Sequence, residues 1–193
     1  GNPLRTAFTQ QPGPAERFAG RSGPLRLLVV GGSLGARALN EIVPQALALM
    51  PADQRPTVLH QSGATQIDAL RANYAVAGVA AECTPFIDDT ASAFAAADII
   101  VCRAGASTVT EIAAVGAASI FVPFPSAVDD HQTTNAQFLV NAGGGWLVQQ
   151  RDLTPQGLSQ MLLNLERSTL VDSAQKAKNM QKINATREVV TAC

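Results

Sequence analysis

The stretch DIIVCRAGASTVTEIAAVG, residues 98–116, decides the fold of this 193-residue chain. Its first part, residues 98–102, begins with Asp98 and continues as an apolar run. Such a run is typical of a strand buried on both faces. Its last part, residues 107–116, has helical spacing and ends at a glycine that can cap a helix. A strand that passes through a short turn into a helix is the repeating unit of a parallel sheet covered by helices.

The same order of strand and helix repeats along the chain. The expected strands cover residues 25–30, 56–60, 80–86, 98–102, 118–124 and 145–149. Four of the expected helices cover residues 36–50, 65–78, 107–116 and 132–143. Three more are expected: one that is capped by Asp88 or Asp89 and ends at Ala97, one that starts at Thr154-Pro155, and one from about residue 170 onward. Pro44 should bend the first helix or delay its start. The pattern predicts an α/β fold: a Rossmann-like parallel sheet with helices on both faces, which binds ligands at the carboxyl ends of its strands.

Three parts of the chain are expected. Residues 1–24, rich in proline and glycine from residue 10 onward, are expected to be an interdomain strand or linker. Residues 25–165 carry the strand and helix repeat and are expected to form one Rossmann-like domain. Residues 166–193 are expected to form C-terminal helices. Because the chain starts at Gly1 without a methionine, we expect it to be a piece of a larger protein.

The composition excludes several classes of protein. Hydrophobic residues make up 47% and charged residues 15%, which indicates a globular chain rather than a disordered one. The net charge of -1 argues against a nucleic-acid binder. The three cysteines lack metal-ligand spacing and are typical of a reducing compartment. No apolar run approaches the roughly 20 residues of a membrane span.

The first strand exit that can carry chemistry is the glycine turn GGSLGA, residues 31–36. Glycines allow close approach of an anion to the backbone, and Ser33 adds a hydroxyl donor. The dinucleotide fingerprint would need a glycine where Val30 stands, and a Walker phosphate loop would need a Gly-Lys pair. A turn that serves packing alone explains the glycines equally well.

The second exit is RAGASTVTEI, residues 103–112. A helix that starts near Ser107 or Thr108 leaves its first N–H groups unpaired, and these groups and the helix dipole suit a diphosphate. Glu111, one turn further, suits the two hydroxyls of a ribose. Alternatively, Thr108-x-x-Glu111 matches a capping box, in which the glutamate only bonds back to the helix start. Spacing alone leaves both interpretations open.

The third exit, residues 122–137, places Asp129, Asp130, His131 and Gln132 before a helix. Carboxylate, amide and imidazole groups in a loop suit sugar hydroxyls. A metal site is the less favoured alternative, since adjacent side chains rarely converge on one ion. His60, at another strand end, is more typical of a structural histidine than of a catalyst.

Seven segments in one order then resemble a known family. They are GNPLR (1–5), GGSLGA (31–36), HQSG (60–63), FIDD (86–89), CRAGASTVTEIAAVG (102–116), FVPFP (121–125) and DDHQTTNA (129–136). The series resembles the C-terminal half of the MurG family of peptidoglycan glycosyltransferases, which have the two-domain GT-B fold. The resemblance implies that residues 25–165 bind the donor, UDP-N-acetylglucosamine.

The resemblance also implies which residues bind that donor. Ser33 would lie near the phosphates, Ile87 would meet the uracil edge through its backbone, and Glu111 would bind the ribose hydroxyls. Gln132 would recognise hydroxyls of the N-acetylglucosamine. The implied substrate-binding residues are Arg5, Ser33, Ile87, Ala106, Ser107, Thr108, Val109, Thr110, Glu111 and Gln132, with Gly32, Arg103 and Asn135 as secondary candidates.

The implied function is donor binding in an inverting transferase that moves N-acetylglucosamine from UDP to lipid I and forms lipid II. No catalytic residue is expected in this chain. The general base, the lipid I site and the membrane-contacting patch belong to an N-terminal domain that the chain lacks, so the fragment is expected to be soluble and inactive alone. No cofactor, metal or nucleic acid is expected. The complete protein is expected to be peripheral, on the cytoplasmic side of the bacterial inner membrane.

Two alternatives remain open from the sequence. One is another GT-B-type UDP-sugar enzyme, such as a UDP-N-acetylglucosamine 2-epimerase, which shares donor recognition but needs its own catalytic carboxylates. The other is a non-catalytic Rossmann-like module that binds NAD or acts as a regulator. The incomplete dinucleotide fingerprint counts against NAD.

Overall fold

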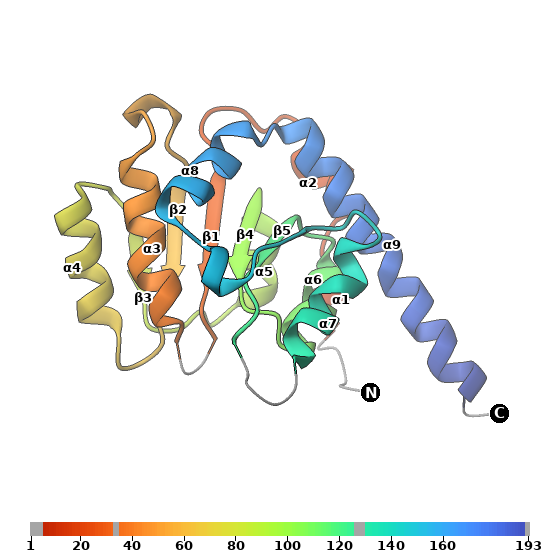
Figure 1. Ribbon diagram of the computed structural model, residues 1–193. Helices are drawn as coiled ribbons and strands as arrows, with labels where there is room; N and C mark the ends of the chain where they lie inside the picture. Colours follow the sequence, from red (N-terminus) through yellow and green to blue (C-terminus); the bar gives the residue numbers. More distant parts are fainter. Residues whose placement is uncertain (1–5, 33–34, 126–129, 192–193) are drawn as a thin grey trace.

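The computed structural model describes residues 6–32, 35–125 and 130–191, with side chains described as far as residue 181. The strands are β1 Arg26–Val30, β2 Thr57–Gln61, β3 Glu82–Thr84, β4 Ile99–Cys102, β5 Ser119–Phe121 and β6 Trp146–Leu147. They form a parallel sheet in the order β3-β2-β1-β4-β5-β6 (Figure 1). The expected fold class, a Rossmann-like parallel sheet, is confirmed.

The order of strands reverses between β1 and β4. From β1 the sheet first grows toward β3, and the chain then returns to place β4 on the other side of β1. Val30 pairs with Gln61 of β2 and with Cys102 of β4, so these three strands end at the same edge. In parallel sheets of this kind, the crevice at such a reversal is where ligands bind.

Helices cover both faces of the sheet. They are α1 Thr6–Thr9, α2 Pro14–Phe18, α3 Arg37–Ala48, α4 Ile67–Ala77, α5 Thr90–Ala96, α6 Ala106–Val115, α7 His131–Val140, α8 Pro155–Asn164 and α9 Arg167–Thr191, with short 3-10 turns at Ala52–Gln54 and Gln150–Asp152. One core holds α3, α4 and α8 against the face that carries Leu27 and Val29, and a second core holds α1, α5, α6 and α7 against the face that carries Leu28 and Ile100 (Figure 1). The long helix α9 contributes buried residues to both cores.

Helix ends follow the expected chemistry. Gly78 and Gly116 terminate α4 and α6 with φ of 66° and 72°, a conformation that glycine adopts without strain. Asp89 caps α5 by accepting from Ser92 N, and Thr154 caps α8 by accepting from Gly157 N. The expected strands 80–86 and 118–124 are shorter than predicted because each segment runs into proline, at Pro85 and at residues 123 and 125.

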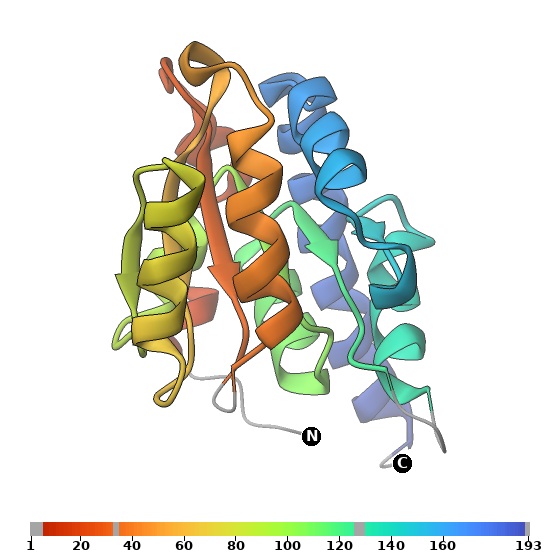
Figure 2. The same ribbon diagram turned by 60° about the vertical axis from the view of Figure 1, so that its left-hand side comes forward.

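Helix α3 continues through Pro44, so the expected late start is wrong. A proline has no N–H to donate to the carbonyl four residues earlier, which here is that of Asn40. The side chain of Asn73, on α4, donates to the Asn40 carbonyl instead, at 2.9 Å. Figure 2 shows α3 and α4 packed side by side, which brings the two residues together. A neighbouring helix thus replaces the hydrogen bond that the proline removes.

The segment before β1 contains two short helices, α1 and α2, separated by residues 10–13, so the expected strand is not found in residues 6–24, while the linker role stays a prediction. Phe8 of α1 is buried and packs edge-on against Phe94, with ring centroids 6.0 Å apart. Arg17 of α2 donates to the carbonyl of Val115 at 2.9 Å, and Lys178 of α9 donates to that of Ala114. Cations from both flanking segments thus hold the C-terminal end of α6, where the helix dipole is negative. The domain boundaries at 24/25 and 165/166 stay predictions.

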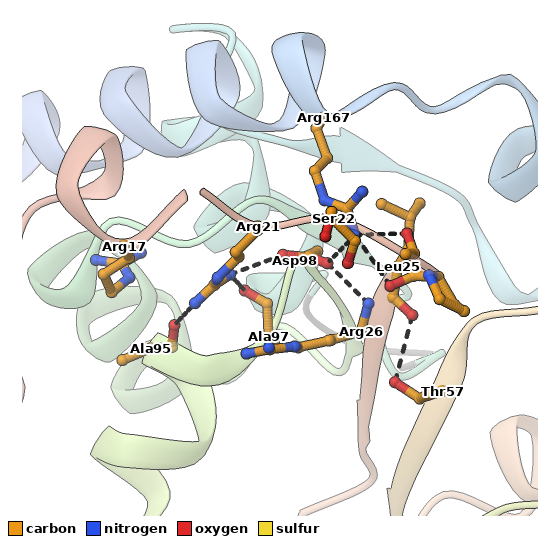
Figure 3. Close-up of polar contacts among 12 residues, drawn as sticks. Arg17, Arg21, Ser22, Leu25, Arg26, Thr57, Ala95, Ala97, Asp98 and Arg167 are labelled. Carbon is orange, nitrogen blue, oxygen red and sulfur yellow. Dashed lines mark hydrogen bonds and ion pairs between the residues drawn. The ribbon is translucent and has the colours of Figure 1, made fainter. Parts of the chain in front are cut away.

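A charged network closes the amino edge of the sheet (Figure 3). Asp98 is 1% exposed and accepts from Arg21 Nη1 at 2.7 Å and from the backbone N of Arg26 at 2.9 Å. Arg167, at the start of α9, lies 3.4 Å from the same carboxylate and donates to the carbonyls of Gly23 and Pro24. This single carboxylate therefore joins the segment before β1, the start of β4 and the last helix.

Candidate functional site

The candidate site lies at the carboxyl edge of the sheet, where β1 and β4 end side by side. The glycine turn, residues 31–36, leaves β1, and the segment Arg103–Gly105 leaves β4. Two further exits flank them, residues 85–89 after β3 and residues 122–125 after β5. The structure thus brings together the strand exits that the sequence singles out.

Packing accounts for two glycines of the turn but leaves the third unexplained. A Cβ on Gly31 would lie 2.7 Å from the backbone N of Ala36, and one on Gly35, where φ is 77°, would lie 2.4 Å from the carbonyl oxygen of Ser62. Both positions therefore require glycine for packing. Gly32 also has a positive φ, of 87°, but a Cβ there would meet nothing within 4 Å. Its surroundings are open, as an anion-binding turn requires.

Gln61, the last residue of β2, holds that open position in place. Its Oε1 accepts from Gly32 N at 3.2 Å, and its Nε2 donates to Gly32 O at 3.0 Å. The same Nε2 donates to Pro85 O at 3.0 Å, in the exit from β3. Gln61 is 4% exposed. The sequence placed the segment 60–63 at a strand end but gave this glutamine no role.

Helix α6 begins at Ala106, one or two residues earlier than expected, with Gly105 as N-cap. Its first helical hydrogen bond runs from Val109 N to Gly105 O at 3.0 Å. The N–H groups of Ala106, Ser107 and Thr108 precede that bond and therefore lie outside the helical pattern. The capping-box interpretation is wrong, because Thr108 is the third residue of the helix rather than its cap. The helix start can instead offer its N–H groups and its positive dipole end to an anion.

The remaining predicted residues of α6 differ in what they offer. Ala106 and Ser107 are exposed, and Thr108 and Glu111 are half-buried on the first two turns. Val109 is 5% exposed and packs in the core, while its N–H serves Gly105. The hydroxyl of Thr110 donates to Ala106 O at 2.8 Å. The predicted roles of all six residues of this segment stay predictions.

Gln132 and Asn135, one turn apart on α7, hold the exit from β4. Gln132 Oε1 accepts from the backbone N of Ala104 at 3.1 Å and from that of Phe124 at 2.9 Å. Asn135 Nδ2 donates to Ala104 O at 3.1 Å. Any contact of Gln132 with a sugar hydroxyl would therefore come from its Nε2. Both residues fix the backbone that leads into α6, a role that spacing alone did not indicate.

Arg103 is directed toward the exit from β5. Its Nη1 donates to Val122 O at 3.2 Å and to Pro123 O at 3.4 Å, and its guanidinium lies 5.4 Å from the ring centroid of Phe124. Burial lowers the pKa of Arg103, although an arginine in a protein remains charged. Its positive charge is thus held at the exit from β5.

Some predicted residues lie outside this arrangement. Ile87, in the exit from β3, is half-buried against the second core, and its carbonyl accepts from the Thr90 hydroxyl at 3.4 Å. Arg5, Ser33 and Asp129 lie outside the described residues. Asp130 caps α7 by accepting from Thr133 N.

His60 is structural, as its sequence context favoured. It is fully buried, with Nδ1 2.8 Å from the Tyr74 hydroxyl and Nε2 2.9 Å from Asn40 Oδ1. Burial lowers the pKa of His60 to about 3, so the ring is neutral at physiological pH. Asn40 Nδ2 also bonds Ser62 O and Gln66 Oε1, so this network joins α3 to the segment between β2 and α4.

The described part of the chain shows no other cluster of reactive groups. Among its side chains, no three His, Cys, Asp or Glu residues are placed to hold a metal ion. Its helices include none that is long and apolar enough to cross a bilayer. Burial raises the pKa of the Cys102 thiol, which is fully buried in β4. The site offers the backbone N–H groups at the start of α6, the amides of Gln132 and Asn135, the guanidinium of Arg103 and the carboxylate of Glu111.

Comparison with known proteins identifies the family to which the chain belongs. The family model of the glycosyltransferase family 28 C-terminal domain matches residues 26–191. The chain is 76% identical over 193 residues to a UDP-N-acetylglucosamine--N-acetylmuramyl-(pentapeptide) pyrophosphoryl-undecaprenol N-acetylglucosamine transferase of Paracidovorax citrulli, and 58% identical to the protein of that name from Cupriavidus metallidurans. Each of these two matches covers the whole of this chain and 54% of the relative. The chain thus spans about half the length of the curated relatives it matches.

Solved structures show the same similarity. The crystal structure of Acinetobacter baumannii MurG has a TM-score of 0.82 and 43% identity, and the match covers 89% of this chain and 50% of that one. The glycosyltransferase VinC, solved with dTDP, has a TM-score of 0.59 at 20% identity, over 94% of this chain and 44% of that one. The second likeness concerns the fold alone.

Proposed function

The chain belongs to glycosyltransferase family 28, whose C-terminal domain it carries, and from that premise we propose that it binds the donor UDP-N-acetylglucosamine for transfer to lipid I. The product of the complete enzyme would be lipid II, formed with inversion at the anomeric carbon. The relatives' names state an N-acetylglucosamine transfer to an undecaprenol-linked muramyl pentapeptide. The chain spans only about half of those relatives, so the activity belongs to the longer protein.

One observation carries the proposal: the start of α6 lies at the reversal of strand order. The N–H groups of Ala106, Ser107 and Thr108 precede the first helical hydrogen bond. Gly32, just after the end of the neighbouring strand β1, has open surroundings. A diphosphate between these two exits would meet backbone donors and the positive end of a helix dipole.

The same geometry suits the chemistry of the transfer. When the bond between sugar and UDP breaks, negative charge develops on the diphosphate. Donors that are already in place stabilise that charge without having to reorganise. The start of α6 would supply them, with Ser33 as a further donor. Glu111 would bind the ribose hydroxyls, Ile87 the uracil edge, and Gln132 and Asn135 the sugar side of the site.

The other requirements of the reaction fall to the rest of the protein. The base that activates the acceptor hydroxyl, the lipid I site and the membrane-contacting surface would lie in the preceding domain of the complete enzyme. We place that enzyme on the cytoplasmic side of the bacterial inner membrane as a peripheral protein, on the strength of its family. UDP-N-acetylglucosamine and lipid I would be its partners, and nucleic acid would not.

Calorimetric titration of this chain tests the proposal. We expect UDP and UDP-N-acetylglucosamine to bind at one site, and NAD to give no response. UDP-glucose should bind more weakly than UDP-N-acetylglucosamine if the β5 exit recognises the N-acetyl sugar. Binding of NAD without binding of UDP would refute the proposal and favour a dinucleotide-binding module. Turnover of lipid I by this chain alone would refute the assignment of the base to the preceding domain.

A further inference from the structure

Gln61 joins two strand exits that are far apart in the sequence. It bonds both the N–H and the carbonyl of Gly32, in the turn after β1, and the carbonyl of Pro85, in the exit from β3. It does so from the end of β2, between the two strands. These three bonds fix how far the glycine turn lies from residues 85–87.

The bonding pattern requires an amide. One oxygen acceptor serves Gly32 N, and one NH₂ group serves two carbonyls at 3.0 Å each. A glutamate would keep the acceptor but lose both donors, and its charge would face two carbonyl oxygens. Because Gln61 is 4% exposed, water does not readily replace the lost bonds. Its neutrality also keeps a fixed negative charge away from an anion site.

On the other side of the proposed site, a second glutamine joins two strand exits in the same way. There Gln132 Oε1 accepts from the N–H groups of Ala104 and Phe124 and so joins the exits from β4 and β5. On each side of the proposed site, a buried or half-buried glutamine thus joins two strand exits. The ligand would lie between these two pairs of exits.

We propose that Gln61 is a positioning residue for nucleoside diphosphate binding. It fixes the position of the glycine turn, which faces the diphosphate, relative to the exit from β3, which faces the base. The inference rests on the proposed function and adds to it a residue that would touch no ligand atom. It acts through the backbone of Gly32 and Pro85. The site is preorganised, and the binding energy of the diphosphate is not spent on ordering the turn.

The test replaces Gln61 by methionine, which has similar length and no hydrogen-bonding amide. UDP affinity is measured by calorimetry at a temperature where each variant is folded. We expect the Kd for UDP in Gln61→Met to rise about tenfold with one site retained, as for the loss of one or two net hydrogen bonds. The matched control is Asn73→Leu, which removes a side-chain amide bond to Asn40 O between α3 and α4. That control should lower the melting temperature and leave the Kd unchanged.

A purely structural role for Gln61 predicts a different result. Gln61→Met would then behave like Asn73→Leu, with a lower melting temperature and the UDP affinity of the parent, and the inference would be overturned. If the parent chain itself fails to bind UDP, it is the proposed function that fails.

A measurement on the unaltered chain keeps the inference testable if Gln61→Met does not fold. Hydrogen exchange of the Gly32 amide should be slow without ligand, because that N–H already bonds Gln61 Oε1. It should remain slow when UDP is added. Fast exchange at Gly32 in the free chain, with protection only when UDP is present, would show that the ligand and not Gln61 orders the turn.

Discussion

The two edges of one sheet are held by different chemistry. At the amino edge a buried carboxylate, Asp98, is paired with Arg21 and Arg167. At the carboxyl edge, Gln61, Gln132 and Asn135 hold strand exits through neutral amides that bond backbone groups. A charged network suits an edge that only has to stay closed. An edge that is to bind a diphosphate, as we propose, is better held by groups without negative charge, because they leave the positive potential of the helix start intact. Arg103, which also bonds these exits, is a cation.

The largest effect is expected from Asp98→Ala at the amino edge. The change leaves Arg21 and Arg167 without their shared carboxylate, and Asp98 is 1% exposed. Breaking a buried ion pair costs about 3–5 kcal/mol. We expect the free energy of unfolding, from urea titration, to fall by about that amount while UDP affinity of the folded chain is unchanged. A weakened UDP affinity would contradict the conclusion that the amino edge serves stability and the carboxyl edge serves binding.

Glu111→Ala should affect the opposite property. Loss of a charged hydrogen bond to the ribose should weaken UDP binding by about 2 kcal/mol, or about thirtyfold. The change removes no helix cap, because Gly105 and not Thr108 is the N-cap of α6. Glu41→Ala, on the exposed surface of α3, is the control and should leave the affinity unchanged. A lower melting temperature with intact UDP affinity would assign Glu111 to stability alone.

The His60 network gives the carboxyl side its own dependence on pH. The pKa of His60 is lowered to about 3 by burial, against 6.5 when exposed. As pH falls below 6.5 the unfolded chain gains a proton that the folded chain does not, so stability is lost as pH falls between about 6.5 and 3. Between pH 8 and pH 5 the loss from this group should be about 2 kcal/mol. The variant His60→Gln should lack this component in urea titrations at the two pH values, and an unchanged pH dependence would contradict it.

The smallest effect is expected from Thr154→Ala at the start of α8. Thr154 Oγ1 accepts from Gly157 N at 3.0 Å, and loss of such a cap costs about 1 kcal/mol. The thermal unfolding midpoint should fall accordingly. Because α8 lies outside the crevice, UDP affinity should be that of the parent. A change in affinity here would show that helix starts away from the β1 and β4 exits also contribute to binding.

Most of the fold could be predicted because local patterns and the final packing agree. Continuous apolar runs predicted the strands, and glycines such as Gly78 and Gly116 predicted where helices end. The disagreements arose where a distant partner decides the outcome. Pro44 stays within α3 because Asn73, on another helix, bonds the carbonyl it leaves unpaired. The helices α1 and α2 form in place of the expected strand because Phe8 and Arg17 contact elements that are far away in the sequence.

The candidate site was predictable in location but not in construction. Spacing placed the glycine turn and the start of α6 at strand exits, and the parallel sheet brings those exits together. Spacing also suggested the capping box at Thr108, which the earlier start of α6 rules out. The role of Gln61 had no sequence signal beyond its place at a strand end, because its partners are backbone atoms of two distant loops.

The cations on the C-terminal end of α6 have a consequence for how the chain is made. Arg17 bonds the Val115 carbonyl and Lys178 bonds that of Ala114, so α6 is completed by residues from both ends of the chain. During synthesis, residues 106–115 leave the ribosome well before residue 178 exists. The helix that would receive the diphosphate therefore has its Gly116 cap and Arg17 early but lacks the Lys178 bond until residue 178 has been made, and a product truncated within α9 before Lys178 would lack that bond.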